Sequence, residues 1–179
     1  MAASTSAHRA EQISELSRKV LWLSSWMIHN ANHLRANVDG LKVGGHQASS
    51  ASMATLLSTL YFGVLNPADR VAVKPHASPA YHAIQYLLGR QTRDKLEAFR
   101  AFGGAQSYPS RTKDSDDVDF STGSVGLGVA FTAFASLIQD YVRAKPWARR
   151  DVGVGRMTAL AGDAELEHLR GVLARPVQR

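Results

Sequence analysis

The chain has 179 residues, of which 45% are hydrophobic and 20% charged, and its formal net charge is +6. This length and this balance are typical of one globular domain with a buried core, and they exclude a disordered chain or a coiled coil. Cysteine is absent, which excludes disulfides, a thiolate nucleophile and cysteine-ligated metals. No apolar run is long enough for a membrane span or a signal peptide, so we expect a cytoplasmic protein without a membrane partner.

The positive charge is spread along the sequence. Arg149 and Arg150 are adjacent, and Arg170, Arg175 and Arg179 lie near the end. No basic run is interleaved with aromatic residues, as stacking on nucleic-acid bases requires. We therefore expect the charge to solvate the surface and predict no nucleic-acid partner.

The first predicted element is an amphipathic helix from Glu11 to Leu34, because apolar residues recur at intervals of three and four. The ten residues before it are interpreted as a frayed start. Trp22 and Trp26 share a face of this helix, and packing in a core or an interface is the favoured interpretation.

A Gly44-Gly45 loop then leads into a helix from Ala48 to Phe62 whose first turns are almost all Ala and Ser. Glycine and small residues let a ligand or another chain lie against the backbone. A loop followed by a tightly packed helix is the alternative.

The remaining elements predict an α/β fold, a parallel sheet flanked by helices. In chain order they are a valine-rich strand (70–74), a helix (80–88), a short helix capped by Thr92 (92–102), an irregular stretch (103–120), a helix from the glycine-rich segment 121–128 to about Tyr141, and an apolar strand that ends in Gly162-Asp163. Long irregular stretches such as 103–120 are often functional.

Ligands of parallel sheets bind beyond the carboxyl ends of the strands. That rule selects two turns, one with His76 and Ser78 and one with Asp163 and Glu165. An aspartate in such a turn is a suitable oxygen ligand for a magnesium ion that carries phosphates. Capping of the following helix by Asp163 is an equally supported alternative.

Two further patterns have a functional and an ordinary interpretation. The segment TGSVGLG (122–128) offers bare N–H groups at a helix start, which suit an anion or a polar ring, but close helix packing through its glycines is an alternative. His46 and His76 stand in Gly- or Pro-rich turns and could donate to phosphate or shuttle protons. We assign no chemistry to His29, His33 or His82.

Five segments, taken in order, resemble the diphosphate-binding half of transketolase-like, thiamine-diphosphate-dependent enzymes: GGHQASSAS, VKPHASPAYHAIQYLLGR, SYPSRT, STGSVGLG and LAGDAE. They are similar in particular to the homodimeric decarboxylating component of the pyruvate dehydrogenase complex. The resemblance implies an N-terminal helical segment (1–37), a diphosphate-binding domain (38–166) with the thiamine-diphosphate-binding fold, here incomplete, and a divergent tail (167–179).

The resemblance also implies roles for particular residues. Those that it places at the cofactor are His46, Ser49, His76, Ser124, Val125, Gly126, Gly162, Asp163 and Ala164. Of these, His46 and His76 would take catalytic roles, and His76 would contact the diphosphate. Main-chain groups of Val125 would border the thiazolium and aminopyrimidine rings, and Asp163 would bind the magnesium ion.

The implied chemistry is attack of a thiazolium ylid on a 2-keto acid. Two features depart from the family. Ala164 stands where the family usually has glycine, and the sequence ends at Arg179, before the position of a second metal ligand, an asparagine. The final stretch LEHLRGVLARPVQR also departs, in a way typical of a changed reading frame or a substituted tail.

These departures predict a truncated cofactor-binding domain of a thiamine-diphosphate-dependent 2-keto-acid (pyruvate) dehydrogenase or decarboxylase, inactive alone. A homodimer or a complementary chain with the pyrimidine-binding domain would complete it. One alternative is a fragment of a transketolase-type sugar transferase. Another is a non-enzymatic interaction module that uses Trp22, Trp26, Phe62 and the small-residue helix as its contact, normally with a second copy.

Overall fold

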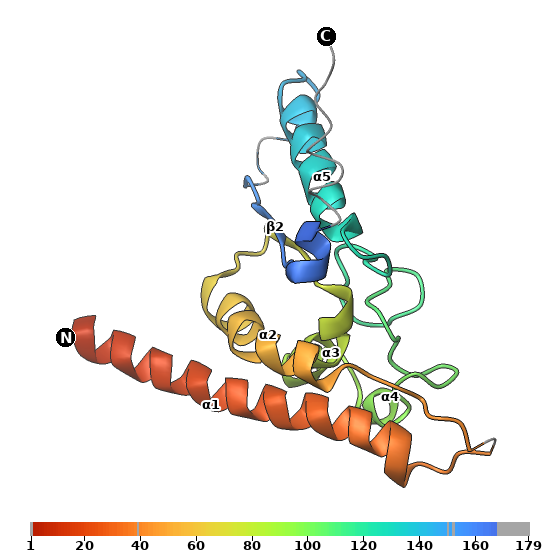
Figure 1. The fold of residues 1–179 in the computed structure, drawn as a ribbon. Coiled ribbons are helices and arrows are strands. Elements are labelled where there is room, and N and C mark those ends of the chain that lie inside the picture. Colours follow the sequence, from red (N-terminus) through yellow and green to blue (C-terminus); the bar gives the residue numbers. More distant parts are fainter. Residues whose placement is uncertain (1, 39, 150, 152, 168–179) are drawn as a thin grey trace.

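The computed structural model describes residues 2–38, 40–149, 151 and 153–167. Its longest element is helix α1 (Ala2–His29), which continues as a π-helical turn, η1 (Asn30–Leu34). The helix runs along one side of the molecule beneath α2 and α3 (Figure 1). Because it begins at Ala2, the expectation of a frayed start over the first ten residues is wrong. Ala-rich sequence favours helix, and the Arg9 guanidinium fastens this end by donating to the carbonyl oxygen of Gly63 at 2.8 Å.

The small-residue helix packs inside the chain. It is α2 (Gln47–Thr59), followed by a π-helical turn, η2 (Leu60–Val64). Ala54 and Ser50 of α2 are buried, and the hydroxyls of Ser17 on α1 and Thr55 on α2 lie 3.1 Å apart. Small side chains let α1 and α2 approach closely, which supports the interpretation of a tightly packed helix.

Helix α3 (Ser78–Leu87) completes this layer and carries much of the core. Its Tyr81 and Ile84 belong to the same buried hydrophobic cluster as Leu57 of α2 and Met27 of α1. A 3-10 turn, η3 (Pro75–Ala77), leads directly into α3. The helix predicted from residue 80 to residue 88 is therefore confirmed, with an earlier start.

The strands β1 (Arg70–Ala72) and β2 (Met157–Ala159) form a parallel two-stranded sheet in which Arg70 pairs with Met157 and Ala72 with Ala159. This parallel pairing is compatible with the predicted α/β arrangement. Both strands are shorter than predicted, because η3 begins three residues after β1 and helical structure begins at Asp163.

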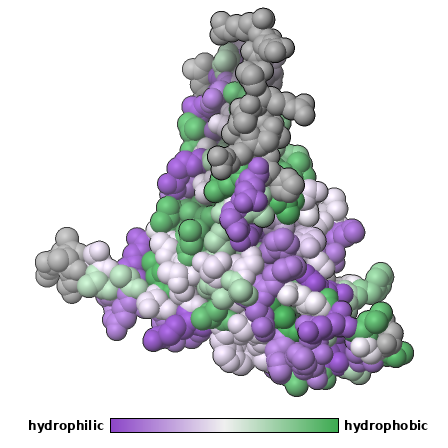
Figure 2. All heavy atoms as spheres, viewed as in Figure 1, coloured by the Kyte–Doolittle hydropathy of each residue, from purple (hydrophilic) through white to green (hydrophobic). Residues whose placement is uncertain are grey.

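Helix α5 (Leu127–Arg143) packs on both strands and leads away from the three-helix layer (Figure 1). Gly128 makes this contact possible, because a Cβ there would lie 3.2 Å from the Cβ of Ala72. Farther along, its apolar side chains Phe134, Leu137, Ile138 and Tyr141 are exposed. Figure 2 shows hydrophobic residues on the surface around this arm of the molecule.

The helix predicted from Thr92 to Phe102 is wrong in its length. Helix α4 (Arg93–Glu97) is one short turn, and Thr92 precedes it without a capping side-chain hydrogen bond. The chain folds back at Arg100, whose φ is +64° and whose N–H donates to the carbonyl oxygen of Ala105 at 2.9 Å. The stretch 103–120 is irregular, as predicted, and no helix in the described ranges is long and apolar enough to cross a bilayer.

Candidate functional site

The structure brings two of the predicted site residues together. The ring centroids of His46 and His76 are 4.1 Å apart, and the ring of Tyr108 meets His76 edge-on at 5.8 Å. His46 immediately precedes α2, whereas His76 lies in η3 just beyond β1. Three separate sequence motifs therefore converge at the carboxyl end of β1, where the strand-end rule places a ligand.

Desolvation and neighbouring charge favour the neutral form of His46. Desolvation lowers the pKa of this imidazole, and the neighbouring His76 and Arg100 lower it further. A neutral ring has one nitrogen that donates a hydrogen bond and one that accepts. His46 can therefore donate to an anion or pass a proton at neutral pH.

Two hydrogen bonds with Asn32 of η1 hold the Gly44-Gly45 loop that positions His46. The side-chain amide of Asn32 donates to the carbonyl oxygen of Gly44 at 2.9 Å, and its oxygen accepts from the Gly44 N–H at 2.8 Å. Gly45 has a φ of +140°, and a Cβ on it would lie 2.7 Å from Cγ2 of Ile28. Gly45 thus permits a close approach to the chain's own first helix, and a Cβ on Gly44 would lie 3.0 Å from Nη1 of Arg100, which supports the alternative of close internal packing.

Arg100 supports the same loop and was missed by sequence reasoning. It is the one non-glycine residue of the described chain with a positive φ, and its Nη1 donates to the carbonyl oxygen of Val43 at 3.1 Å. Strained backbone of this kind often occurs at functional sites. No pattern around Arg100 in the sequence marks it.

The second predicted turn follows β2. The Gly162 N–H donates to Oε2 of Glu165 at 2.7 Å, so Glu165 caps the helical residues that begin at Asp163. The alternative in which Asp163 is the cap is therefore wrong. Asp163 is exposed, and the described residues offer its carboxylate no hydrogen bond or ion pair, so it is available to a metal ion.

In the described ranges, the other predicted site residues make no side-chain hydrogen bond with the histidine pair. Gly126 has a left-handed φ of +81° immediately before α5, and no side chain caps that helix. Ser124, which is exposed, and Val125, which is partly buried, precede it. The hydroxyl of Ser49 is buried without a hydrogen-bond partner in the described part of the chain. Of the ring contacts in the ranges that the structure describes, the one between His46 and His76 joins two predicted residues.

His82, Asp114 and Asp116 also place possible ligand atoms within 4.8 Å of one another. Nδ1 of His82 lies 2.9 Å from Oδ2 of Asp116, and Nε2 lies 3.0 Å from the carbonyl oxygen of Gln106. Because both ring nitrogens face acceptors, both donate and neither is free for a metal. Burial opposes the charged ring, but the hydrogen bond and charge of Asp116, the charge of Asp114 and the hydrogen bond to the Gln106 carbonyl together outweigh it and raise the pKa of His82. This group therefore stabilises the fold.

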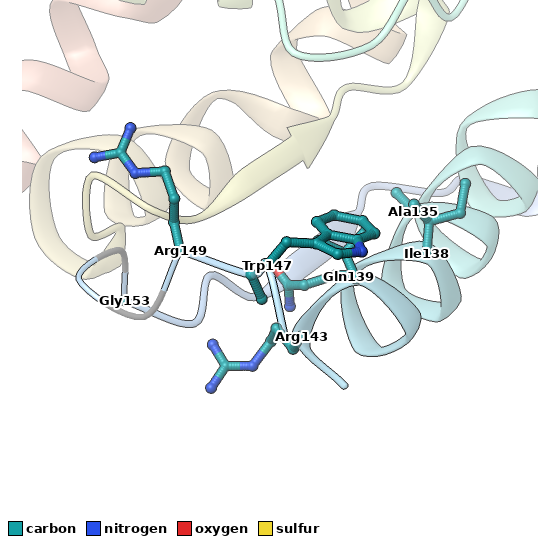
Figure 3. A pocket seen from close by; sticks show the side chains of 9 residues that line it. Ala135, Ile138, Gln139, Arg143, Trp147, Arg149 and Gly153 are labelled. Carbon is teal, nitrogen blue, oxygen red and sulfur yellow. The ribbon is translucent and has the colours of Figure 1, made fainter. Parts of the chain in front are cut away.

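A groove of about 580 Å³ lies beside the carboxyl-terminal half of α5. Figure 3 shows Trp147 and Arg143 at this groove, with Ile138 and Gln139 on the helix beside them. None of the predicted cofactor residues lines it. The groove is therefore separate from the histidine pair.

Known proteins of one class are similar in sequence to this chain. The sequence matches no protein-family profile. It is 31% identical over 159 residues to the pyruvate dehydrogenase E1 component of Mycolicibacterium smegmatis, and 33% identical over 143 residues to that of Cupriavidus necator. The chain is thus similar to part of the E1 component.

The similarity to E1 covers 83% of this chain in the first comparison and 75% in the second, but the chain spans only 16% of either relative's length. The E1 component of Escherichia coli gives a similar result, with 30% identity over 143 residues. The predicted resemblance to this protein class is therefore confirmed. The chain corresponds to a limited segment of E1.

Proposed function

We propose that this E1-like chain forms the diphosphate-binding domain of a thiamine-diphosphate-dependent 2-keto-acid dehydrogenase or decarboxylase that acts on pyruvate. The paired rings of His46 and His76, 4.1 Å apart at the carboxyl end of β1, carry the proposal. The similarity to E1 supports it. Magnesium is the implied metal, because it commonly binds through a carboxylate and phosphate oxygens.

The residues present fit such a cofactor. Neutral His46 and its neighbour His76 offer ring N–H groups to phosphate oxygens, and the unpartnered carboxylate of Asp163 would hold the magnesium ion. The buried hydroxyl of Ser49 has a donor and lone pairs that no described residue uses. The bound cofactor would supply the thiazolium carbanion and act as an electron sink.

The chain's own residues would bind and orient rather than complete the reaction. His46 would donate to the diphosphate or hold a proton near the substrate, and the backbone around Gly126 would face the rings of the cofactor. The pyrimidine-binding part would come from a second copy or from a complementary chain. We therefore expect cofactor binding by this segment and turnover only in the completed assembly.

Calorimetric titration of thiamine diphosphate with magnesium chloride into the folded chain tests the proposal. Asp163→Ala should abolish or strongly weaken the binding, because it removes the proposed metal ligand. Asp140→Ala is the matched control, since Asp140 is an exposed aspartate on α5. Absence of binding to a wild-type chain whose circular dichroism shows a folded protein would refute the proposal.

Binding should also raise the midpoint of thermal unfolding, because a ligand that binds only the native state stabilises it by mass action. The rise should grow with cofactor concentration in the wild type and in Asp140→Ala. It should be absent in Asp163→Ala. This second measurement separates specific binding from a heat of dilution or of aggregation.

A further inference from the structure

Lys74 follows β1 and reaches across to the end of β2. Its Nζ lies 2.6 Å from the position that a Cβ on Gly162 would occupy, and its Cε lies 2.9 Å from the same point. Only glycine at position 162 leaves room for this ammonium. Lys74 is therefore a cation between the two strand ends, two residues before His76.

A buried carboxylate faces the same point. Oε2 of Glu165 lies 2.9 Å from the Gly162 Cβ position, and Glu165 is only 3% exposed. Oε2 accepts the Gly162 N–H, but Oε1 is buried with no hydrogen-bond partner among the described residues. A buried carboxylate needs a compensating positive charge, and Lys74 supplies one across Gly162.

This arrangement leaves the N–H donors of the Lys74 ammonium available for a ligand. Within the ranges that the structure describes, Lys74 makes no side-chain hydrogen bond and no ion pair with Glu165 closer than 4.0 Å. The side chain is partly exposed, so its donors can reach a ligand. Glu165 attracts the ammonium to the strand ends and leaves its three N–H donors available.

We propose that Lys74 binds a phosphate group of the cofactor's diphosphate, and that Glu165 and Gly162 position its ammonium at the strand ends. The inference rests on the proposed function, which places the diphosphate beside His76. An ammonium is a compact point charge that suits phosphate oxygens. Lys74 would thus add a fixed positive charge to the histidine pair on one side of the ligand.

The test measures the affinity of two probes, magnesium thiamine diphosphate and magnesium pyrophosphate, for the wild type and for Lys74→Gln. Loss of one charge-assisted hydrogen bond should weaken both probes by about ten- to a hundredfold. Lys19→Gln is the matched control, because Lys19 is an exposed lysine on α1, and it should bind both probes as the wild type does.

A second variant, Gly162→Ala, keeps the lysine but places a methyl group where its ammonium lies. The ends of flexible side chains can move away, so we expect a folded protein with the same loss of affinity as Lys74→Gln. Equal affinity of wild type and Lys74→Gln for both probes would overturn the inference and leave the proposed function standing. Lysine-dependent binding of pyrophosphate without binding of thiamine diphosphate would support Lys74 as a phosphate ligand and refute the proposed function. Binding of neither probe by the folded wild type would refute both.

Discussion

Substitution of Gly45 by alanine tests the account of the loop that carries His46. Gly45 has a φ of +140°, which L residues rarely adopt, and the new methyl group would lie 2.7 Å from Cγ2 and 3.0 Å from Cγ1 of Ile28. Backbone strain at such a position costs about 1–3 kcal/mol, and overpacking of a core side chain costs about 1–3 kcal/mol more. We expect Gly45→Ala to lower the free energy of unfolding by about 2–6 kcal/mol, measured by urea denaturation.

Three further variants separate strain from overlap. Gly89→Ala reports strain alone, because Gly89 has a φ of +74° and open space around it. Ile28→Ala removes both overlapping carbons, so Gly45→Ala should cost less in that background than in the wild type. Ile28→Val keeps two γ carbons and should give no such relief. The reasoning is refuted if Gly45→Ala costs no more than Gly89→Ala, or if the two Ile28 backgrounds give the same result.

Three other predictions concern stability. Arg156 and the Asn66 N–H donate hydrogen bonds to the carboxylate of Asp69 and hold its pKa well below the usual range. The contribution of Asp69 to stability is therefore present above the unfolded pKa of about 3.9 and is lost as the pH falls. Asp69→Asn should flatten the decline in melting temperature between about pH 5 and pH 2, and an unchanged decline would contradict this. The raised pKa of His82 gives a contribution to stability that is complete below about pH 6.5 and is lost as the pH rises through the folded pKa. The melting temperature of the wild type should therefore fall between about pH 5 and about pH 9, and that of His82→Gln should not show this fall. A Cβ on Gly155 would overlap the carbonyl oxygen of Ala68, so Gly155→Ala should lower the free energy of unfolding by about 1–3 kcal/mol or more. Gly153 has open space around it, so Gly153→Ala should change this free energy by less than about 0.5 kcal/mol. Equal effects of the two substitutions would count against the close packing at Gly155.

Periodicity in the sequence predicted the elements that depend on local pattern. The helix from Glu11, the small-residue helix and the two parallel strands are all present, because each has its own apolar spacing. The length of α4 was not predictable in this way. That helix stops where Arg100 turns back to pair with Ala105, and a run of good helix formers does not report such a turn.

The candidate site was predictable only in part. The strand-end rule selected His76, and the family resemblance selected His46, but their contact depends on the path of the Gly44-Gly45 loop over Ile28. Lys74 and Arg100 were not singled out, since a lysine after a strand and an arginine in a helical pattern are common. Their surroundings come from segments distant in sequence, which local patterns do not reveal.

The pairing of β1 with β2 has a consequence for the order of folding. The ion pair between Asp69 and Arg156, at the start of these strands, joins residues 87 positions apart, whereas α1, α2 and α3 are neighbours in sequence. Contacts across long separations form slowly, because the entropy of closing the loop is lost before the contact stabilises the chain. The three-helix layer, with the His46 loop on it, should therefore form first and serve as the surface on which the later sheet assembles.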